Sequence, residues 1–227
     1  MACNSGPDII EDGLVLCLDA ANINSYPKSG TTWSDLVGAN DGTLNNMDAS
    51  NFSSDNRGTL SFDGSNENVT IPASTNYGTP EFTVCYWIYS LNQNSGYDAH
   101  LDINPSFIPN LNWSFGPATG RPELRFWINS SVPLTYDSAK NYYLEWRYLS
   151  WTYNYSQTTG RIYEDGVLVA QNTAINKIIT NNATIKIGND RFNSSTVGKF
   201  SSILMYDREL TADEIRRNYE ATVGRYT

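Results

Sequence analysis

Short apolar runs, rich in β-branched and aromatic residues, recur along the whole chain and are separated by clusters of Gly, Asn, Asp and Pro. A spacing of about ten residues between such runs is typical of antiparallel sandwiches, whereas βαβ units would alternate strands with helical periods. The sequence therefore predicts an all-β fold of two antiparallel sheets. The predicted strands cover residues 13–18, 59–62, 68–71, 82–89, 111–115, 124–128, 147–153, 161–163, 167–170, 184–187 and 199–206.

Two runs predict more detailed structure. Both alternating faces of Phe82–Tyr89 are bulky, so this strand should lie in the middle of a sheet, covered on each side, with residues 146–153 as its neighbour. The dipeptide Asp165-Gly166 can adopt the two positive φ angles of a tight hairpin turn, which would place Ile162 opposite Val169.

Only the C-terminal tail has a helical pattern. Thr211 and Glu214 can form a capping box, and Ile215 and Tyr219 would then share one face. No stretch has the composition and length of an interdomain linker. We expect one β-sandwich domain over residues 13–227 with a short C-terminal helix, preceded by an N-terminal arm over residues 1–12.

The net charge and the targeting signals limit the classes of partner that we expect for this chain. The chain of 227 residues has a formal net charge of −9, which disfavours nucleic acid and anionic membranes as ligands. We find neither a signal peptide nor an apolar stretch of membrane-spanning length. The odd set of Cys3, Cys17 and Cys85 favours folding in a reducing cytoplasm.

Several motifs, in order, resemble a known family. They are Gly13–Ala20, Ser29-Gly-Thr-Thr-Trp-Ser-Asp-Leu36, Asp41-Gly-Thr-Leu44, Leu60-Ser-Phe-Asp-Gly64, the 82–89 and 146–153 runs, Tyr163-Glu-Asp-Gly166 and Met205–Ile215. Together they are similar to laminin-G-like domains of the concanavalin A-like lectin/glucanase superfamily over residues 10–225. The resemblance implies a two-sheet antiparallel jelly roll. The Ser-Gly-Thr-Thr-Trp segment is similar to versions found in structural proteins of tailed bacteriophages.

The carboxylates do not form a catalytic pattern. Glycosidases of the resembled superfamily carry a Glu-x-Asp-x-(x)-Glu strand, and this chain lacks one. Glu145 stands alone, and adjacent strand positions such as Glu164 and Asp165 should face opposite ways. The single His100 has no nucleophile motif or second histidine around it, so we expect a structural role for it. The chain is therefore predicted not to be an enzyme.

Calcium is the metal that the resemblance suggests, because relatives in this superfamily often bind Ca²⁺. Asp35, Asn40 and Asp41 offer hard oxygen ligands in one turn-rich loop. The alternative is that Asp35 and Asn40 bind their own loop's backbone. Asp63 and Asp207 are weaker candidates. A structural Ca²⁺ is thus an expectation, and no other cofactor is required.

Aromatic side chains are the remaining candidates for ligand contact. Trp33, Trp87, Trp146 and Trp151 lie in strands or family motifs and should pack in the interior. Tyr97, Tyr136 and Tyr155 lie among turn residues and could contact a glycan or a protein partner.

These observations and the resemblance lead to one functional hypothesis and two alternatives. The leading hypothesis is a non-enzymatic virion protein of a bacteriophage, made in the host cytoplasm, that decorates a capsid or tail, binds other virion proteins and contacts cell-surface polysaccharide. Its attachment arm would include Asn4, Pro7, Asp8 and Ile9. The alternatives are a soluble lectin without a virion and a glycoside hydrolase.

Overall fold

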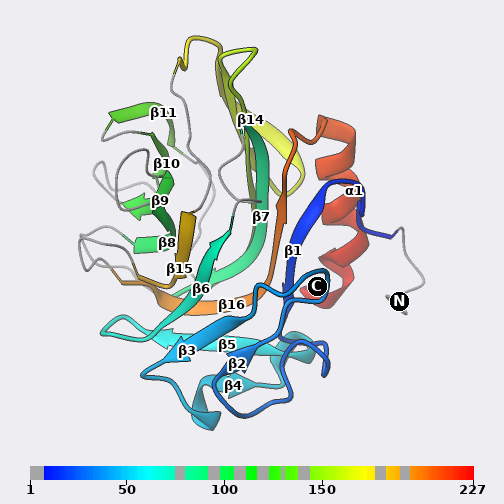
Figure 1. Cartoon of the computed structure of the whole chain (residues 1–227), viewed down its shortest axis with the longest axis vertical. Coiled ribbons are helices and arrows are strands. Elements are labelled where there is room, and N and C mark those ends of the chain that lie inside the picture. Colours follow the sequence, from blue (N-terminus) through cyan, green and yellow to red (C-terminus); the bar gives the residue numbers. More distant parts are fainter. Residues whose placement is uncertain are drawn as a thin grey trace.

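The computed structural model describes residues 8–74, 80–91, 98–104, 111–116, 123–128, 131–137, 144–176, 183–189 and 195–227. In this part of the chain two antiparallel sheets, which we call sheet A and sheet B, enclose a hydrophobic core, and one α-helix lies outside them (Figure 1). This confirms the predicted all-β, two-sheet sandwich with a short C-terminal helix.

Sheet A has eight strands, and every pairing in it is antiparallel. β1 pairs with one half of β16, while β5 pairs with the other half. The order across the sheet is β14 (Val167–Asn172), β13 (Thr159–Glu164), β12 (Trp146–Asn154), β7 (Glu81–Ser90), β16 (Val197–Tyr206), β5 (Thr59–Asp63) and β4 (Phe52–Ser53), with β1 (Leu14–Asp19) beside β16.

Sheet B also has eight antiparallel strands. Their order is β11 (Ser131–Asp137), β10 (Glu123–Ile128), β9 (Leu111–Gly116), β8 (Asp98–Asn104), β15 (Ala183–Ile187), β6 (Asn68–Ser74), β3 (Gly42–Asn45) and β2 (Thr32–Trp33). Five strands were not predicted from the sequence, because they are two residues long or combine apolar positions with Asp, Asn, Ser or Pro: β2, β3, β4, β8 and β11.

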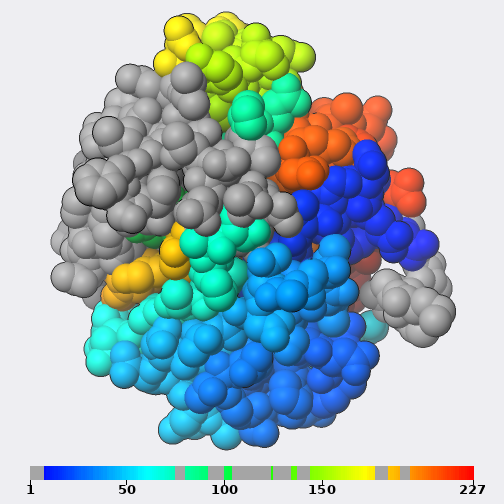
Figure 2. Space-filling view, viewed as in Figure 1, coloured from blue at the N-terminus to red at the C-terminus, as the bar shows by residue number. Residues whose placement is uncertain are grey.

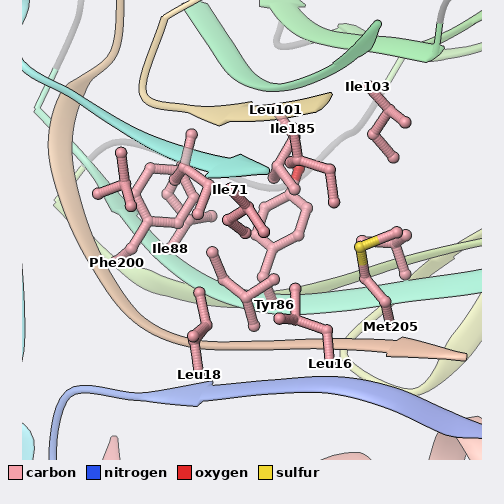
Figure 3. Packing of buried hydrophobic residues seen from close by; sticks show 14 of the residues in the cluster. Leu16, Leu18, Ile71, Tyr86, Ile88, Leu101, Ile103, Ile185, Phe200 and Met205 are labelled. Carbon is pink, nitrogen blue, oxygen red and sulfur yellow. The ribbon is translucent and has the colours of Figure 1, made fainter. Parts of the chain in front are cut away.

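β7 lies in the middle of the sheet with β12 as its neighbour, as predicted; its other neighbour is β16, and residues 82–88 are all buried. On its inner face Tyr86 and Ile88 pack in the core of the sandwich (Figure 3). On its outer face Cys85 and Trp87 belong to a second apolar cluster under the helix. Trp33 and Trp151 are also buried in the core, and Trp146 packs partly buried against the second cluster, so the four tryptophans predicted to pack do so.

The helix α1 (Ala212–Thr222) begins with the predicted capping box, in which Thr211 accepts a hydrogen bond from the Glu214 N–H. α1 covers the outer face of sheet A. Ile215 is fully buried there, and the Tyr219 ring stacks on Trp87 at 5.7 Å between centroids. The Trp87 Nε1–H donates to Thr222 at 2.8 Å, which fixes the helix at its C-terminal end. Short 3₁₀ helices complete the secondary structure at Ala49–Asn51, Asp55–Arg57 and Val223–Arg225.

The β13–β14 hairpin has the predicted turn, with φ of 51° at Asp165 and 78° at Gly166. The predicted register is wrong beyond the first two pairs, because a β-bulge shifts the pairing and places Ile162 opposite Ala170 rather than Val169. No helix in the described residues is both long and apolar enough to cross a membrane.

Replacing Gly166 by Val should destabilise the protein by about 1–3 kcal/mol, because a β-branched residue is strained at positive φ. Its Cβ would also lie 3.2 Å from the Cβ of Tyr219 in α1. Gly224 is a matched control, since a Cβ there meets nothing within 4 Å. Urea denaturation of both Gly→Val variants measures the difference. Equal midpoints would contradict the role of the turn.

Candidate functional site

Within residues 43–45, 68–71 and 184–187 of sheet B, polar residues that point outward alternate with apolar residues that point into the core. In β3, β6 and β15 the residues Leu44, Val69, Ile71, Ile185 and Ile187 point into the core and are almost completely buried. Their neighbours in sequence therefore point away from the core. These outward residues are Thr43, Asn45, Asn68, Thr70, Thr184 and Lys186. Together with Thr32 of β2 and Asp102 of β8, we call them the polar face of sheet B.

Strand register aligns part of this face into one row that crosses five strands. The direct Cα partners along it are Thr32, Thr43, Thr70, Lys186 and Asp102. Thr32 and Thr43 are exposed, Thr70 and Lys186 are half-buried, and Asp102 is 1% exposed. The row thus runs from an open end at β2 to a covered end at β8.

Hydrogen bonds orient the polar side chains next to this row. The Asn45 Nδ2 donates to Asn68 Oδ1 at 2.9 Å and to Thr70 Oγ1 at 3.0 Å, and the Thr70 hydroxyl donates to Asn68 Oδ1 at 3.2 Å. Amides and hydroxyls supply both donors and acceptors, and pre-oriented groups lose little freedom when a ligand binds. Chemically, this arrangement suits a ligand rich in hydroxyl groups.

None of these residues was among the site residues predicted from the sequence. The alternation in Asn68-Val-Thr-Ile71 and in Thr184-Ile-Lys-Ile187 does identify outward polar positions. Their grouping into one face depends on β15 pairing with β6, which are more than a hundred residues apart in sequence, and no local pattern encodes that pairing.

The predicted calcium loop is held by hydrogen bonds from N–H groups. Asp35 is 8% exposed; its Oδ1 accepts from the N–H groups of Cys17 and Val37, and its Oδ2 from those of Gly38 and Asn40. Asp41 accepts from the N–H of Asp35. The loop thus has the geometry of the alternative in which Asp35 binds the backbone. Among the described residues, no group of three His, Cys, Asp or Glu side chains could hold a metal ion.

Changing Asp35 to Ala should destabilise the protein by about 2–4 kcal/mol, because one buried and three part-buried N–H groups lose their acceptor. Asp63 is a matched control, since it is exposed and accepts from the N–H of Ser65 alone. Thermal unfolding of both Asp→Ala variants, with calcium and with a chelator, measures the effect. We expect the destabilisation of the Asp35 variant to be the same in both conditions. A difference that appears only with calcium would instead place an ion in the loop.

The structure describes two of the three candidate tyrosines. Tyr136 and Tyr155 are half-buried and pack against the core cluster, so most of each ring is used in packing. Tyr97 lies outside the described residues.

The carboxylates considered for catalysis gather around one arginine. The Arg147 guanidinium contacts Glu145, Glu164 at 3.9 Å and Asp165 at 3.4 Å. The prediction that Glu164 and Asp165 face opposite ways is wrong, because Asp165 has left-handed turn geometry rather than extended backbone. All three carboxylates thus contact the same cation.

His100 has the structural environment that the sequence suggested. It is 2% exposed, its Nδ1 lies 2.8 Å from the Tyr86 hydroxyl, and its ring packs edge-on against Phe200. Burial lowers its pKa from 6.5 to about 3, which keeps the imidazole neutral near pH 7.

The predicted arm is bound to the domain over residues 8–12. Asn218, fully buried in α1, accepts from the Ile10 N–H at 2.8 Å, while the Tyr206 hydroxyl donates to the Ile10 carbonyl at 2.9 Å. The Arg217 Nε donates to the Asp8 carbonyl, and Ile9 packs against the cluster under the helix. Asn4 and Pro7 lie outside the described residues.

The sequence model of the concanavalin A-like lectin/glucanases superfamily matches residues 63–216, which is more than half of the chain. The chain belongs to this superfamily. Curated protein sequences contain no match.

Solved structures show the same fold at low sequence identity. The Trypanosoma rangeli sialidase in complex with the inhibitor DANA has a TM-score of 0.73 and 16% identity, and the match covers 100% of this chain but 37% of the sialidase. Domain 4 of AbnA, a GH43 extracellular arabinanase from Geobacillus stearothermophilus, in complex with arabinotriose, has a TM-score of 0.70 and 16% identity over 92% of this chain and 100% of the domain. A SAP-like pentraxin from Limulus polyphemus has a TM-score of 0.57 and 17% identity over 70% and 79% of the two chains.

Proposed function

We propose that this protein is a non-catalytic carbohydrate-binding module and that the polar face of sheet B binds the glycan. The observation that carries the proposal is the hydrogen-bonded group of Asn45, Asn68 and Thr70 beside the row of outward side chains. Sugars present many hydroxyl groups, each of which donates and accepts, and such a group of amides and hydroxyls matches them.

The architecture favours sheet B over sheet A for this role. The outer face of sheet A is covered by α1 and its apolar cluster, so the middle of that face is closed to ligands. The polar face of sheet B is open at Thr32 and Thr43, and side chains anchored on strands are held more rigidly than those on loops.

One of the solved structures is consistent with the proposal. Domain 4 of the arabinanase AbnA matches this fold over its whole length and was solved with arabinotriose. A domain of this architecture and size can therefore bind an oligosaccharide, and we extend that property to this chain as part of the proposal.

The absence of catalysis is supported by the carboxylates around Arg147. A retaining glycosidase needs two carboxyl groups about 5 Å apart, one of them protonated as an acid and the other free as a nucleophile. Glu145, Glu164 and Asp165 all contact one guanidinium, so each is engaged in an ion pair with Arg147. This arrangement suits an ion-pair cluster with a structural role.

Binding should weaken about tenfold when Thr70 or Asn45 is changed to Ala, because each change removes oriented hydrogen-bonding groups from the site. The ligand is first identified on a glycan array, run with calcium and with a chelator, and affinity is then measured by calorimetry. Gln171→Ala, on the exposed part of β14 in sheet A, is the control and should bind like the wild type. Full affinity in the Asn45 and Thr70 variants would exclude this face.

A second candidate role is attachment of this module to a bacteriophage particle, as the resemblance suggests. The specific observation in its favour is that Asp8–Asp12 are bound beside α1, on the outer side of sheet A, whereas the polar face belongs to the outer side of sheet B (Figure 1). An attachment segment preceding Asp8 would thus leave the opposite side of the sandwich free for a glycan. A soluble lectin without a virion stays the alternative.

Removing residues 2–7 should abolish co-sedimentation with virus particles and leave the unfolding midpoint unchanged, because the hydrogen bonds of Asp8 and Ile10 are kept. Removing residues 2–12 should lower the midpoint as well, since the buried Asn218 then loses its Ile10 partner. Particle binding by the chain that lacks residues 2–7 would contradict the attachment role.

A further inference from the structure

We infer that the glycan bound by sheet B is acidic and that Lys186 recognises its carboxylate or sulfate group. This inference rests on the proposed function and specifies its ligand class. It follows from the surroundings of one side chain in the middle of the row, between Thr70 of β6 and Asp102 of β8.

Lys186 is a half-buried cation for which the described residues offer no anionic partner. Within the described part of the chain, no hydrogen bond or ion pair engages its ammonium group. Other half-buried cations here are paired: Lys199 with Asp55 at 3.0 Å, and Arg208 with Glu214 at 2.7 Å. Because removing a charge from water costs free energy unless an opposite charge compensates, an unpaired ammonium on a ligand face favours an anionic ligand.

The nearest candidate partner within the described part of the sheet, Asp102, forms no ion pair with Lys186. Asp102 is its direct Cα partner across the strand, at a separation where opposite charges commonly pair. The two side chains nevertheless form no ion pair among the described contacts, and Asp102 is 1% exposed with interactions of its own. The ammonium group thus remains available on the ligand side.

Charge and neighbouring groups make this position suitable for an acidic sugar. The net charge of −9 repels polyanions overall, so an acidic glycan needs a local cation in its site. Lys186 provides three N–H donors. Thr70 and Thr184, both half-buried on the same face, add hydroxyls on either side for the sugar hydroxyls next to the charged group.

The test compares glycans that differ only in charge: polygalacturonate and its carboxyl-reduced form, sialylated and desialylated oligosaccharides, and sulfated and desulfated heparan chains. The wild type should bind the acidic member of at least one pair about tenfold more tightly, because a charge-assisted hydrogen bond is lost in the neutral member. The pair that shows the preference identifies the acidic group as a carboxylate or a sulfate.

Variants of Lys186 then test whether this side chain recognises the acidic group of the glycan. Lys186→Gln should weaken binding of the acidic member about tenfold and leave the neutral member unchanged, whereas Lys186→Arg should keep the preference. Arg216→Gln is the control, because it removes one positive charge from a side chain of α1 that is 60% exposed. This variant should also keep the preference for the acidic member.

The outcomes separate the two proposals. Equal binding of acidic and neutral members, or a preference that Lys186→Gln leaves intact, would overturn the inference and leave the glycan-binding function standing. No binding to any charged or neutral glycan, by protein shown to be folded, would overturn both.

Discussion

The fold depends on burial of both faces of β7. Tyr86 and Ile88 on one face require an opposing sheet, and Cys85 and Trp87 on the other require a cover that sheet B cannot supply. α1 is that cover, and Trp87 connects them through rings stacked at 5.7 Å and 3.9 Å with Tyr219 and Tyr226 and through its bond to Thr222. Because aromatic side chains bury large apolar areas, this outer cluster holds the C-terminal helix on the sandwich.

This cover determines which surface is left for a ligand. With α1 on sheet A, the molecule has three layers, and the outer side of sheet B is the one that faces away from the helix (Figure 1). The space-filling view agrees that the segments around β3 and β6 reach the surface on the side away from α1 (Figure 2). The same alternation that fills the core with Val69, Ile71 and Ile185 thus places Thr70 and Lys186 outside. The same strand register in sheet B therefore determines both the packing of the core and the position of the candidate site.

The sequence predicts the features of this fold that depend on local patterns. The two-sided burial of Phe82–Tyr89, the Asp165-Gly166 turn and the Thr211–Glu214 cap are each encoded within a few residues, and all three are confirmed. The bulge that places Ile162 opposite Ala170 lies beyond the turn, between Ile162 and Tyr163, and the turn dipeptide does not determine it. The polar face of sheet B was not predicted from the sequence, for a related reason. Its members come from strands distant in sequence, so their grouping becomes visible only when the order of strands is known.

The gradient of burial along the row would also orient a glycan bound to this face. Thr32 and Thr43 are exposed and Asp102 is covered, so a linear glycan on this face can continue toward β2 and has its end near β8. Lys186 lies next to the covered end, where water is scarcer and a charged hydrogen bond is stronger. Discrimination between acidic and neutral sugars would therefore take place at the inner end of the row. The amide and hydroxyl groups of Asn45 and Thr70 nearer the open end would contribute affinity that depends little on ligand charge.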